Sequence, residues 1–356
     1  MAAQTVALKT GEKLTIRVAE PPFPEYTGKV GCWWSAVRDE LFAGELKPWL
    51  YTPYVVGELD GQVVGYISYW TPTDTRDVGL VEFVSTAEGH RRKGIASALM
   101  TRLIEHFQSG GGLALYLCTT NPQAGGLYEK SGFWYHIGDG MRYLATEAGD
   151  FDATYLSFCG EACARLSTWA DLPRAAALFN HPEPRWLIKD YMTQTFRHTR
   201  YESHFMALRK RLENGRGACV VLENPNRRVV GLASFERLDT HQEQHVANLS
   251  FRVCPAYTSQ TNELLDAAAD QARELSIGIL QIHVADPDLD QKELAESCGF
   301  EEEARLRNRL RDGERSVDLL VYTRVLEDAP TPLREEGDYY GGRKAWQAER
   351  VAVETV

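Results

Sequence analysis

One stretch decides how the N-terminal half of the chain folds: Val84-Ser85-Thr86-Ala87-Glu88-Gly89-His90-Arg91-Arg92-Lys93-Gly94-Ile95-Ala96-Ser97. The apolar run at residues 79–85 predicts a β-strand, and the apolar periodicity of residues 95–107 predicts an amphipathic helix. A turn that leads from a strand into a helix points backbone N–H groups and the positive end of the helix dipole at one spot. Gly94 leaves room for a close approach, and the basic residues 91–93 add positive charge. The stretch therefore predicts an anion site of the kind that holds phosphates.

A second informative segment follows the next predicted strand, residues 113–118. It contains Asn121-Pro122, Ala124 and then Leu127-Tyr128-Glu129-Lys130-Ser131-Gly132-Phe133. The first stretch resembles the pyrophosphate-binding Arg-x-x-Gly-x-Ala motif of the GNAT superfamily of N-acetyltransferases. The second resembles that superfamily's Asn-…-Tyr-Glu-Lys-x-Gly-Phe segment. Two signatures in the correct order are much more specific than either one alone.

The resemblance implies a CoA-dependent acyltransferase that uses acetyl-CoA or another acyl-CoA as cosubstrate, and no metal. It implies that the backbone at Val84 holds the thioester carbonyl, that Asn121 contacts the pantetheine arm and that Tyr128 protonates the departing CoA thiolate. A phenol suits this task, since its reference pKa of ~10 lies near the ~8.5 of a thiol. The cofactor-binding residues implied by the resemblance are Val84, Ser85, Thr86, Arg91, Arg92, Lys93, Gly94, Ile95, Ala96, Ser97, Asn121 and Tyr128.

Glu82 is the nearest candidate for the base that takes a proton from an attacking amine. It stands two residues before Val84, so regular strand alternation puts both side chains on one face. A partly buried, hydrogen-bonded carboxylate without a catalytic role fits the same pattern equally well. His90 and His136 are weaker candidates, because histidines at such positions more often pack or form hydrogen bonds.

The chain contains two copies of one plan. A hairpin at residues 54–68 recurs at residues 219–234, and the Gly-Phe pair at residues 132–133 recurs at residues 299–300. Between these points each copy shows a strand, a helix, a strand and a short helix in the same order. This order predicts an α/β protein with two tandem acetyltransferase-type domains, each a mixed, mostly antiparallel sheet flanked by helices.

The second copy lacks the residues that make the first one informative. Ala295 stands opposite Tyr128, and residues 256–262, opposite the basic turn, contain neither a glycine nor a basic residue. We therefore expect a degenerate second domain that shapes the substrate cleft or fixes assembly. The predicted bounds are 1–146 for the catalytic acyl-CoA-binding domain, 147–160 for a linker, 161–328 for the degenerate domain and 329–356 for a C-terminal tail.

The segment between the first strand and the first hairpin, about residues 20–54, is where the resemblance places the acceptor. It is rich in aromatic residues, which can form an apolar wall for a substrate or pack the helices and domains together. The candidate substrate residues are Trp33, Trp34 and Glu82, and the other aromatic residues of the segment are Phe42, Trp49, Tyr51 and Tyr54.

Composition excludes several classes of protein. The chain has 356 residues, of which 44% are hydrophobic and 25% charged, as in a globular protein with two domains. Without an apolar run of the ~20 residues that a bilayer span needs, or a secretory signal, we expect a cytoplasmic protein that does not bind membranes. A net charge of −11 argues against a broad basic face for nucleic acid. The seven scattered cysteines predict free thiols.

These observations predict an N-acyltransferase that moves an acetyl or other short acyl group from acyl-CoA to a primary amine of a small molecule. The amine would attack directly in a ternary complex. Two other hypotheses stay open: a non-catalytic acyl-CoA sensor, and a decarboxylase or hydrolase of acyl-CoA on the same fold. A homodimer is expected only by analogy.

Overall fold

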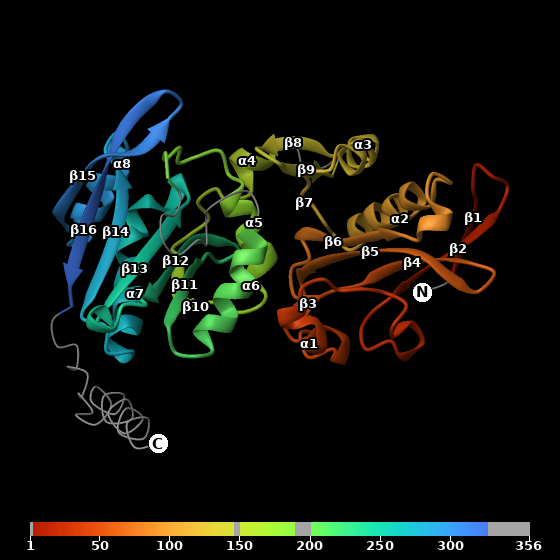
Figure 1. Ribbon diagram of the computed structural model, residues 1–356, viewed down its shortest axis with the longest axis horizontal. Helices are drawn as coiled ribbons and strands as arrows, with labels where there is room; N and C mark the ends of the chain where they lie inside the picture. Colours follow the sequence, from red (N-terminus) through yellow and green to blue (C-terminus); the bar gives the residue numbers. More distant parts are fainter. Residues whose placement is uncertain (1–2, 146–149, 189–200, 327–356) are drawn as a thin grey trace, which may run out of the picture.

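Two β-sheets lie side by side along the long axis of the molecule, one from each half of the chain (Figure 1). The structure is a computed structural model and describes residues 3–145, 150–188 and 201–326. Both sheets are mixed and mostly antiparallel, with helices on their faces. The tandem α/β architecture predicted from the internal repeat is therefore confirmed, while the predicted tail at 329–356 lies outside the described residues.

The first sheet holds the predicted anion site. Its strands have the spatial order β1-β2-β4-β5-β6-β7-β9-β8, with β3 paired to β5. The predicted strands and helices around the basic turn are confirmed, with ends that differ by at most two residues. The strands are β1 (Gln4–Ala7), β2 (Lys13–Ala19), β3 (Leu50–Tyr51), β4 (Tyr54–Leu59), β5 (Gln62–Pro72), β6 (Val78–Thr86), β7 (Ala114–Cys118), β8 (Trp134–Ile137) and β9 (Gly140–Leu144), and the helices are α1 (Arg38–Ala43), α2 (Ile95–Ser109) and α3 (Pro122–Lys130).

The second sheet repeats this topology in the order β10-β11-β12-β13-β14-β16-β15. Its strands are β10 (Cys163–Leu166), β11 (Gly217–Glu223), β12 (Val229–Arg237), β13 (Val246–Val253), β14 (Ile279–Ala285), β15 (Glu301–Asp312) and β16 (Arg315–Val325). The helices of this half are α4 (Phe151–Thr154), α5 (Asp171–Phe179), α6 (Tyr201–Leu212), α7 (Thr261–Glu274) and α8 (Leu289–Ser297). α4 falls in the predicted linker, and its Phe151 is buried.

In each sheet, two parallel neighbouring strands pair only at their beginnings. The ladder between β6 and β7 runs from Val78↔Ala114 to Leu80↔Tyr116, although β6 continues to Thr86. The ladder between β13 and β14 is equally short, from Val246↔Ile279 to Asn248↔Gln281. Beyond these points the facing backbone N–H and C=O groups of the two strands do not bond to each other, so they need other partners.

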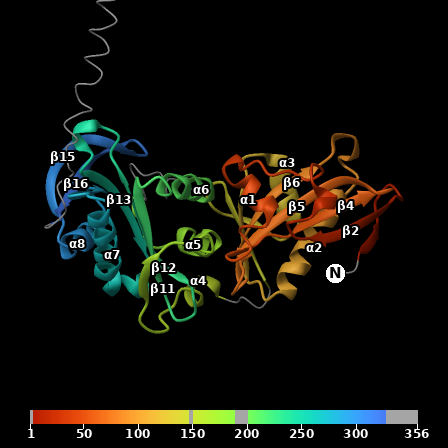
Figure 2. The same ribbon diagram turned by 90° about the horizontal axis from the view of Figure 1, so that it is seen from below.

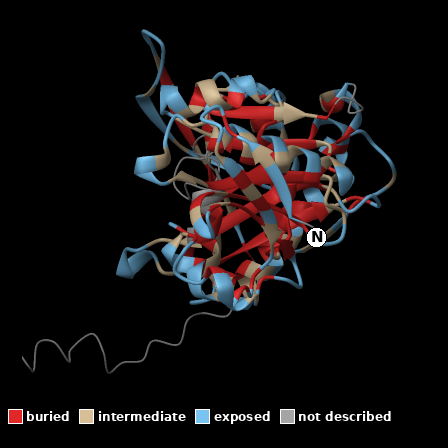
Figure 3. Ribbon diagram, turned by 90° about the vertical axis from the view of Figure 1, so that its right-hand side faces the viewer, coloured by how far each residue is buried: buried red, intermediate tan, exposed pale blue. Residues whose placement is uncertain are grey.

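The hydrophobic core has two parts. One cluster fills the space between the first sheet and α2, which turns Leu99, Leu103 and Phe107 inward at helical spacing. The other cluster is continuous across both halves and joins the opposite face of the first sheet to α5, which packs against β5 and β6. Figure 2 shows α5 and α6 between the two sheets, and Figure 3 shows the buried strands behind exposed loops.

Ion pairs and hydrogen bonds also link the two halves. Arg174 of α5 donates to both carboxylate oxygens of Asp74, at 2.7 and 2.6 Å, and Lys210 of α6 lies 2.6 Å from Glu40. The second half therefore covers the face of the first sheet that α2 leaves open. Within the described residues, no helix has the length and apolar character needed to cross a bilayer.

Candidate functional site

The N-terminus of α2 is built to receive an anion. Gly94 is its N-cap residue, with a φ of 93° in the left-handed region that favours glycine, and no side chain caps the helix. The first-turn N–H groups of an α-helix have no partner within the helix. A Cβ added at Gly94 would have Lys9 Cγ, 3.9 Å away, as its only described neighbour within 4 Å, so there is space for a ligand to approach the backbone.

The basic residues beside this helix end differ in how much of their charge is compensated. Lys93 pairs with Glu12 at 2.9 Å. Arg91 and Arg92 are exposed, and neither forms an ion pair with a residue that the structure describes. Arg91 instead donates a long hydrogen bond of 3.5 Å to the carbonyl of Thr86. Two guanidinium groups whose charge no described carboxylate compensates therefore stand next to an uncapped helix N-terminus, a combination that suits a pyrophosphate.

A β-bulge in β6 corrects the prediction that Glu82 and Val84 share one face. Ser68 of β5 pairs with Glu82 and Tyr66 with Ser85, so two residues of β6 stand opposite one of β5. The irregularity includes Phe83, whose φ of 55° lies in the left-handed region. Glu82 contacts Trp34 on the face covered by the second half, whereas Val84 packs against the cluster around α2. The bulge breaks the two-residue period on which the prediction rested.

Glu82 is a buried carboxylate with a defined partner. Its side chain is 7% exposed, and it accepts a hydrogen bond of 2.9 Å from the indole Nε1–H of Trp34. Its negative charge raises the pKa of Tyr128, which belongs to α3 across the end of the β6–β7 ladder. The predicted base and the predicted acid therefore lie close enough to interact.

Tyr128 combines burial with a free hydroxyl. It is 7% exposed, and its hydroxyl has no hydrogen-bond partner among the described residues. Burial, and then the charge of Glu82, raise the pKa of Tyr128 to about 12. The ring packs against Phe133 at a centroid distance of 6.0 Å. At neutral pH this phenol is protonated and able to donate.

Asn121 acts as the N-cap of α3. Its Oδ1 accepts hydrogen bonds from the N–H groups of Gln123, at 3.0 Å, and Ala124, at 3.5 Å. Pro122 follows at the first helical position, where its missing N–H costs nothing. The side-chain amide Nδ2 of Asn121 is therefore the group that remains for a ligand contact.

The aromatic residues of the segment at 20–54 separate into different environments. Trp34 binds Glu82, and the exposed Trp33 stands edge-on to Phe83 at 4.8 Å, so both lie at the site. Phe42 and Tyr54 pack with each other in the core. The sequence left open whether these rings line a substrate site or pack the helices and domains together. Their contacts place Trp33 and Trp34 beside Glu82 and Phe83, and Phe42 and Tyr54 in the core.

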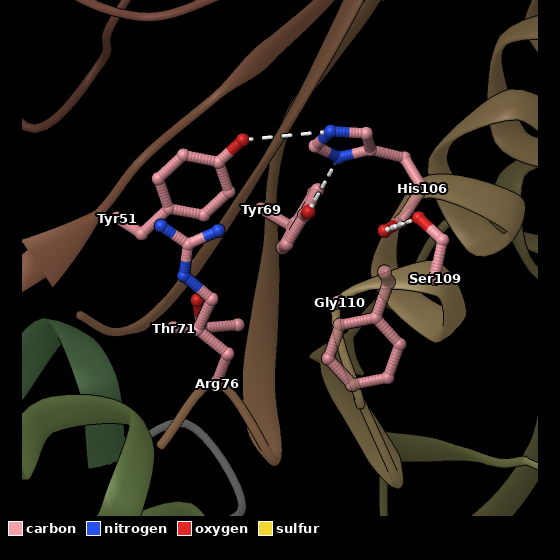
Figure 4. Close-up of a pocket in the computed structure, with 8 residues that line it drawn as sticks. Tyr51, Tyr69, Thr71, Arg76, His106, Ser109 and Gly110 are labelled. Carbon is pink, nitrogen blue, oxygen red and sulfur yellow. Dashed lines mark hydrogen bonds between the residues drawn. The ribbon is translucent and has the colours of Figure 1, made fainter. Parts of the chain in front are cut away.

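Tyr51 lies at a second location, a cavity of about 180 Å³ at the other end of α2 (Figure 4). There His106 is buried, with its Nδ1 2.7 Å from the Tyr69 hydroxyl and its Nε2 3.5 Å from the Tyr51 hydroxyl. The Arg76 guanidinium stacks on the Tyr51 ring at 3.8 Å. The predicted catalytic, cofactor and substrate residues are absent from the lining of this cavity.

The second copy has the same backbone around different side chains. The N–H of Phe133 binds the carbonyl of Tyr128 at 3.0 Å, and the N–H of Phe300 binds that of Ala295 at the same distance. Ala295 therefore occupies the position of the acid, as the repeat predicted. β12 and β13 pair without a register shift, so the described second sheet has no counterpart of the bulge at Phe83.

The chain was compared with solved structures and with protein families. Several solved acetyltransferases each cover about half of the chain: yncA, a putative acetyltransferase from Salmonella typhimurium with acetyl-CoA (20% identity, 49% of this chain and 98% of that chain, TM-score 0.41), and a phosphinothricin acetyltransferase from Sinorhizobium meliloti in complex with AcCoA (16%, 48% and 91%, 0.40). A spermidine N-acetyltransferase from Vibrio cholerae is 18% identical over 48% of this chain and 98% of that chain, with a TM-score of 0.39.

No curated protein matches the chain in sequence. The family model described as "Acetyltransferase (GNAT) family" matches it twice, at residues 18–133 and 178–300. The two matches fall on the two sheets and together cover more than half of the chain. The protein is thus a member of the GNAT acetyltransferase family with two tandem domains of that family.

Proposed function

We propose that the N-terminal domain, residues 1–146, transfers an acetyl or other short acyl group from acyl-CoA to a primary amine of a small molecule. The observation that carries the proposal is a buried carboxylate, Glu82, held by the indole N–H of Trp34 at 2.9 Å, whose charge raises the pKa of the buried Tyr128. A carboxylate can accept a proton and a protonated phenol can donate one, so Glu82 and Tyr128 would serve as the base and the acid of acyl transfer.

The chain's own residues fit the cosubstrate. The uncapped start of α2 and the guanidinium groups of Arg91 and Arg92 would hold the pyrophosphate. The backbone of β6 at residues 84–86, which does not pair with β7, would bind the pantetheine amides and the thioester carbonyl on that edge. Nδ2 of Asn121 would bind the arm from the other side. The acyl-CoA supplies an activated acyl group and a thiolate leaving group.

Proton transfer then divides between the two side chains. An ammonium group cannot attack a carbonyl carbon, so Glu82 takes the proton that the amine loses, directly or through a water. The new C–N bond forms as the C–S bond breaks, and Tyr128 gives its proton to the sulfur. With its pKa raised to about 12, Tyr128 is fully protonated before the reaction. Trp34 fixes the Glu82 carboxylate through its indole N–H.

The test is a transfer assay with acetyl-CoA and a panel of primary amines, in which free CoA thiol and the acylated amine are both measured. We expect amine-dependent release in the wild type and a decrease of at least ~10²-fold in kcat for Tyr128→Phe, in line with the loss of a general acid. Tyr135→Phe is the matched control, because it removes the same hydroxyl from an exposed tyrosine.

Other results of this assay would favour one of the alternative functions or refute the cofactor site. Acetyl-CoA binding without release from any amine would favour an acyl-CoA sensor. CoA release without an amine would indicate a hydrolase or, with a carboxylated acyl group, a decarboxylase. No binding of acetyl-CoA at all would refute the cofactor site.

A further inference from the structure

We propose that the second domain fills its own acyl-CoA position with residues 178–188, and that this seated segment positions α5 on the acceptor face of the first domain. We call residues 178–188 the inserted segment, and Arg252, Phe251 and Asp288 the socket that holds it. Socket residues then act as positioning residues for the acceptor. That last step rests on the acyl transfer proposed above, whereas the seating of the segment does not.

The repeat identifies the socket. Gly65 pairs with Thr86 in the first sheet and Gly231 with Val253 in the second, so Arg252 occupies the position of Ser85. Phe251 stands where the first sheet has the bulged pair of residues 83–84. Asp288 is the N-cap of α8, as Asn121 is of α3. The socket therefore corresponds to the positions that would contact the thioester and the pantetheine arm in the first domain.

Arg252 binds the inserted segment through main-chain carbonyls. Its side chain is 1% exposed, and its guanidinium donates four hydrogen bonds of 2.9 to 3.2 Å. A buried guanidinium is costly unless its donors are satisfied, so four carbonyls on one segment indicate a built contact. The accepting carbonyls belong to Leu178, His181, Glu183 and Pro184.

The far end of the inserted segment reaches the other strand of the pair. The N–H of Leu187 donates to the Asp288 carboxylate at 2.8 Å. Trp186 is 6% exposed, donates from Nε1 to Asp290 at 3.0 Å and packs edge-on against Phe251 at 5.4 Å. The segment thus spans from β13 to the start of α8, the same course that a pantetheine arm would follow between β6 and α3.

The inserted segment and α5, which leads into it, also contact the first domain. Arg174 of α5 binds Asp74 in the β5–β6 loop, and the carbonyl of Asn180 lies 2.9 Å from Nε2 of His136. α5 packs on β5 and β6, on the face where Glu82 meets Trp34. A segment anchored in the second domain therefore forms part of the support behind the acceptor side of the first.

Hydrogen exchange of the full chain tests the seating directly. In Arg252→Met, four carbonyls lose the hydrogen bonds that hold the segment to β13, so we expect amide exchange in residues 171–187 to rise at least ~tenfold. Arg237→Met is the matched control: Arg237 also binds backbone carbonyls of the second domain, those of Gln244 and Leu275, and it does not touch the segment. It should leave exchange in residues 171–187 unchanged. If Arg252→Met does not fold, Asp288→Ala provides the same comparison at the other end, because it removes the oxygen that accepts the Leu187 N–H.

Titration of the full chain with CoA measures how many CoA molecules bind to each chain. The wild type is expected to bind one CoA per chain, because the second position is occupied. Two equivalent sites per chain, or equal exchange of residues 171–187 in Arg252→Met and Arg237→Met, would overturn the seating of the segment.

Kinetics test the positioning role. With the best amine acceptor found in the panel, Arg252→Met should raise the acceptor KM at least ~fivefold and leave the Kd for CoA within ~twofold. An unchanged acceptor KM would refute the positioning role. If the wild type transfers no acyl group, the proposed function fails, and hydrogen exchange and CoA stoichiometry still decide whether the segment fills the socket.

Discussion

At the scale of single residues, burial determines the protonation of the titratable groups. Tyr128 and His106 are both buried, and burial shifts each pKa toward the neutral form: upward to about 12 for the phenol and downward to about 4 for the imidazole. For Tyr128 the neutral form is the proton donor that acyl transfer needs. For His106 the neutral form is the one that shares hydrogen bonds with the hydroxyl groups of Tyr69 and Tyr51.

His106 gives a prediction for stability against pH. Its pKa falls from 6.5 in the unfolded chain to about 4 in the fold, first because of burial and then because of the charges of Arg102 and Arg76. Between these values the unfolded chain binds a proton that the folded chain does not, so stability is complete above pH 6.5 and decreases as pH falls toward 4. The expected loss is about 3 kcal/mol by pH 4, from about 1.36 kcal/mol per unit of pKa.

Urea unfolding of the wild type and of His106→Gln, at pH 7 and pH 4.5, measures this effect. Glutamine is near in size and does not titrate, so the difference in free energy of unfolding between the two proteins should narrow at low pH. A constant difference across this range would contradict a depressed pKa for His106.

At the scale of elements, regular features were predictable and irregular ones were not. The spacing of apolar residues predicted α2 and its start at Ile95, because an amphipathic helix leaves its period in the sequence. The bulge at Phe83 left no such signal, since its residues are as apolar as their neighbours, and it reversed the expected facing of Val84. The anchoring of Trp186 and Leu187 by α8 depends on a distant pairing that one sequence does not show.

The shape of the turn before α2 leads to a prediction about CoA affinity. Gly94→Ala adds a Cβ at a φ of 93°, where side chains are strained whatever the space. The N–H groups at the start of α2 should move from their positions, so the Kd for CoA is expected to rise at least ~tenfold, equivalent to about 1.4 kcal/mol. Gly89→Ala is the control in the same loop, because it has no positive φ and its added Cβ meets nothing within 4 Å. Calorimetric titration with CoA measures both, and equal affinities would remove the α2 start from the cofactor site.

At the scale of the whole molecule, the two domains share one core. The cluster that contains Trp70, Leu80 and Phe83 of the first sheet continues into Leu172 and Ala176 of α5. Around it, Arg174 is 3% exposed and holds Asp74. A domain that relies on its neighbour to cover a sheet face differs from two independent domains joined by a linker, even though the repeat in the sequence presents two similar units.

The shared core predicts that residues 1–146 do not form a stable domain alone. Without α5, the face of β5 and β6 opposite α2 would expose large apolar side chains, at a cost of roughly 25 cal/mol per Å². We expect the fragment to aggregate or to lack a cooperative unfolding transition by circular dichroism. A full chain cut once within residues 146–149 is the control, since both pieces remain and every contact described here can form. A fragment 1–146 that unfolds cooperatively with the same midpoint as the full chain would show that the first sheet needs no cover, and the second domain would then serve the acceptor side alone.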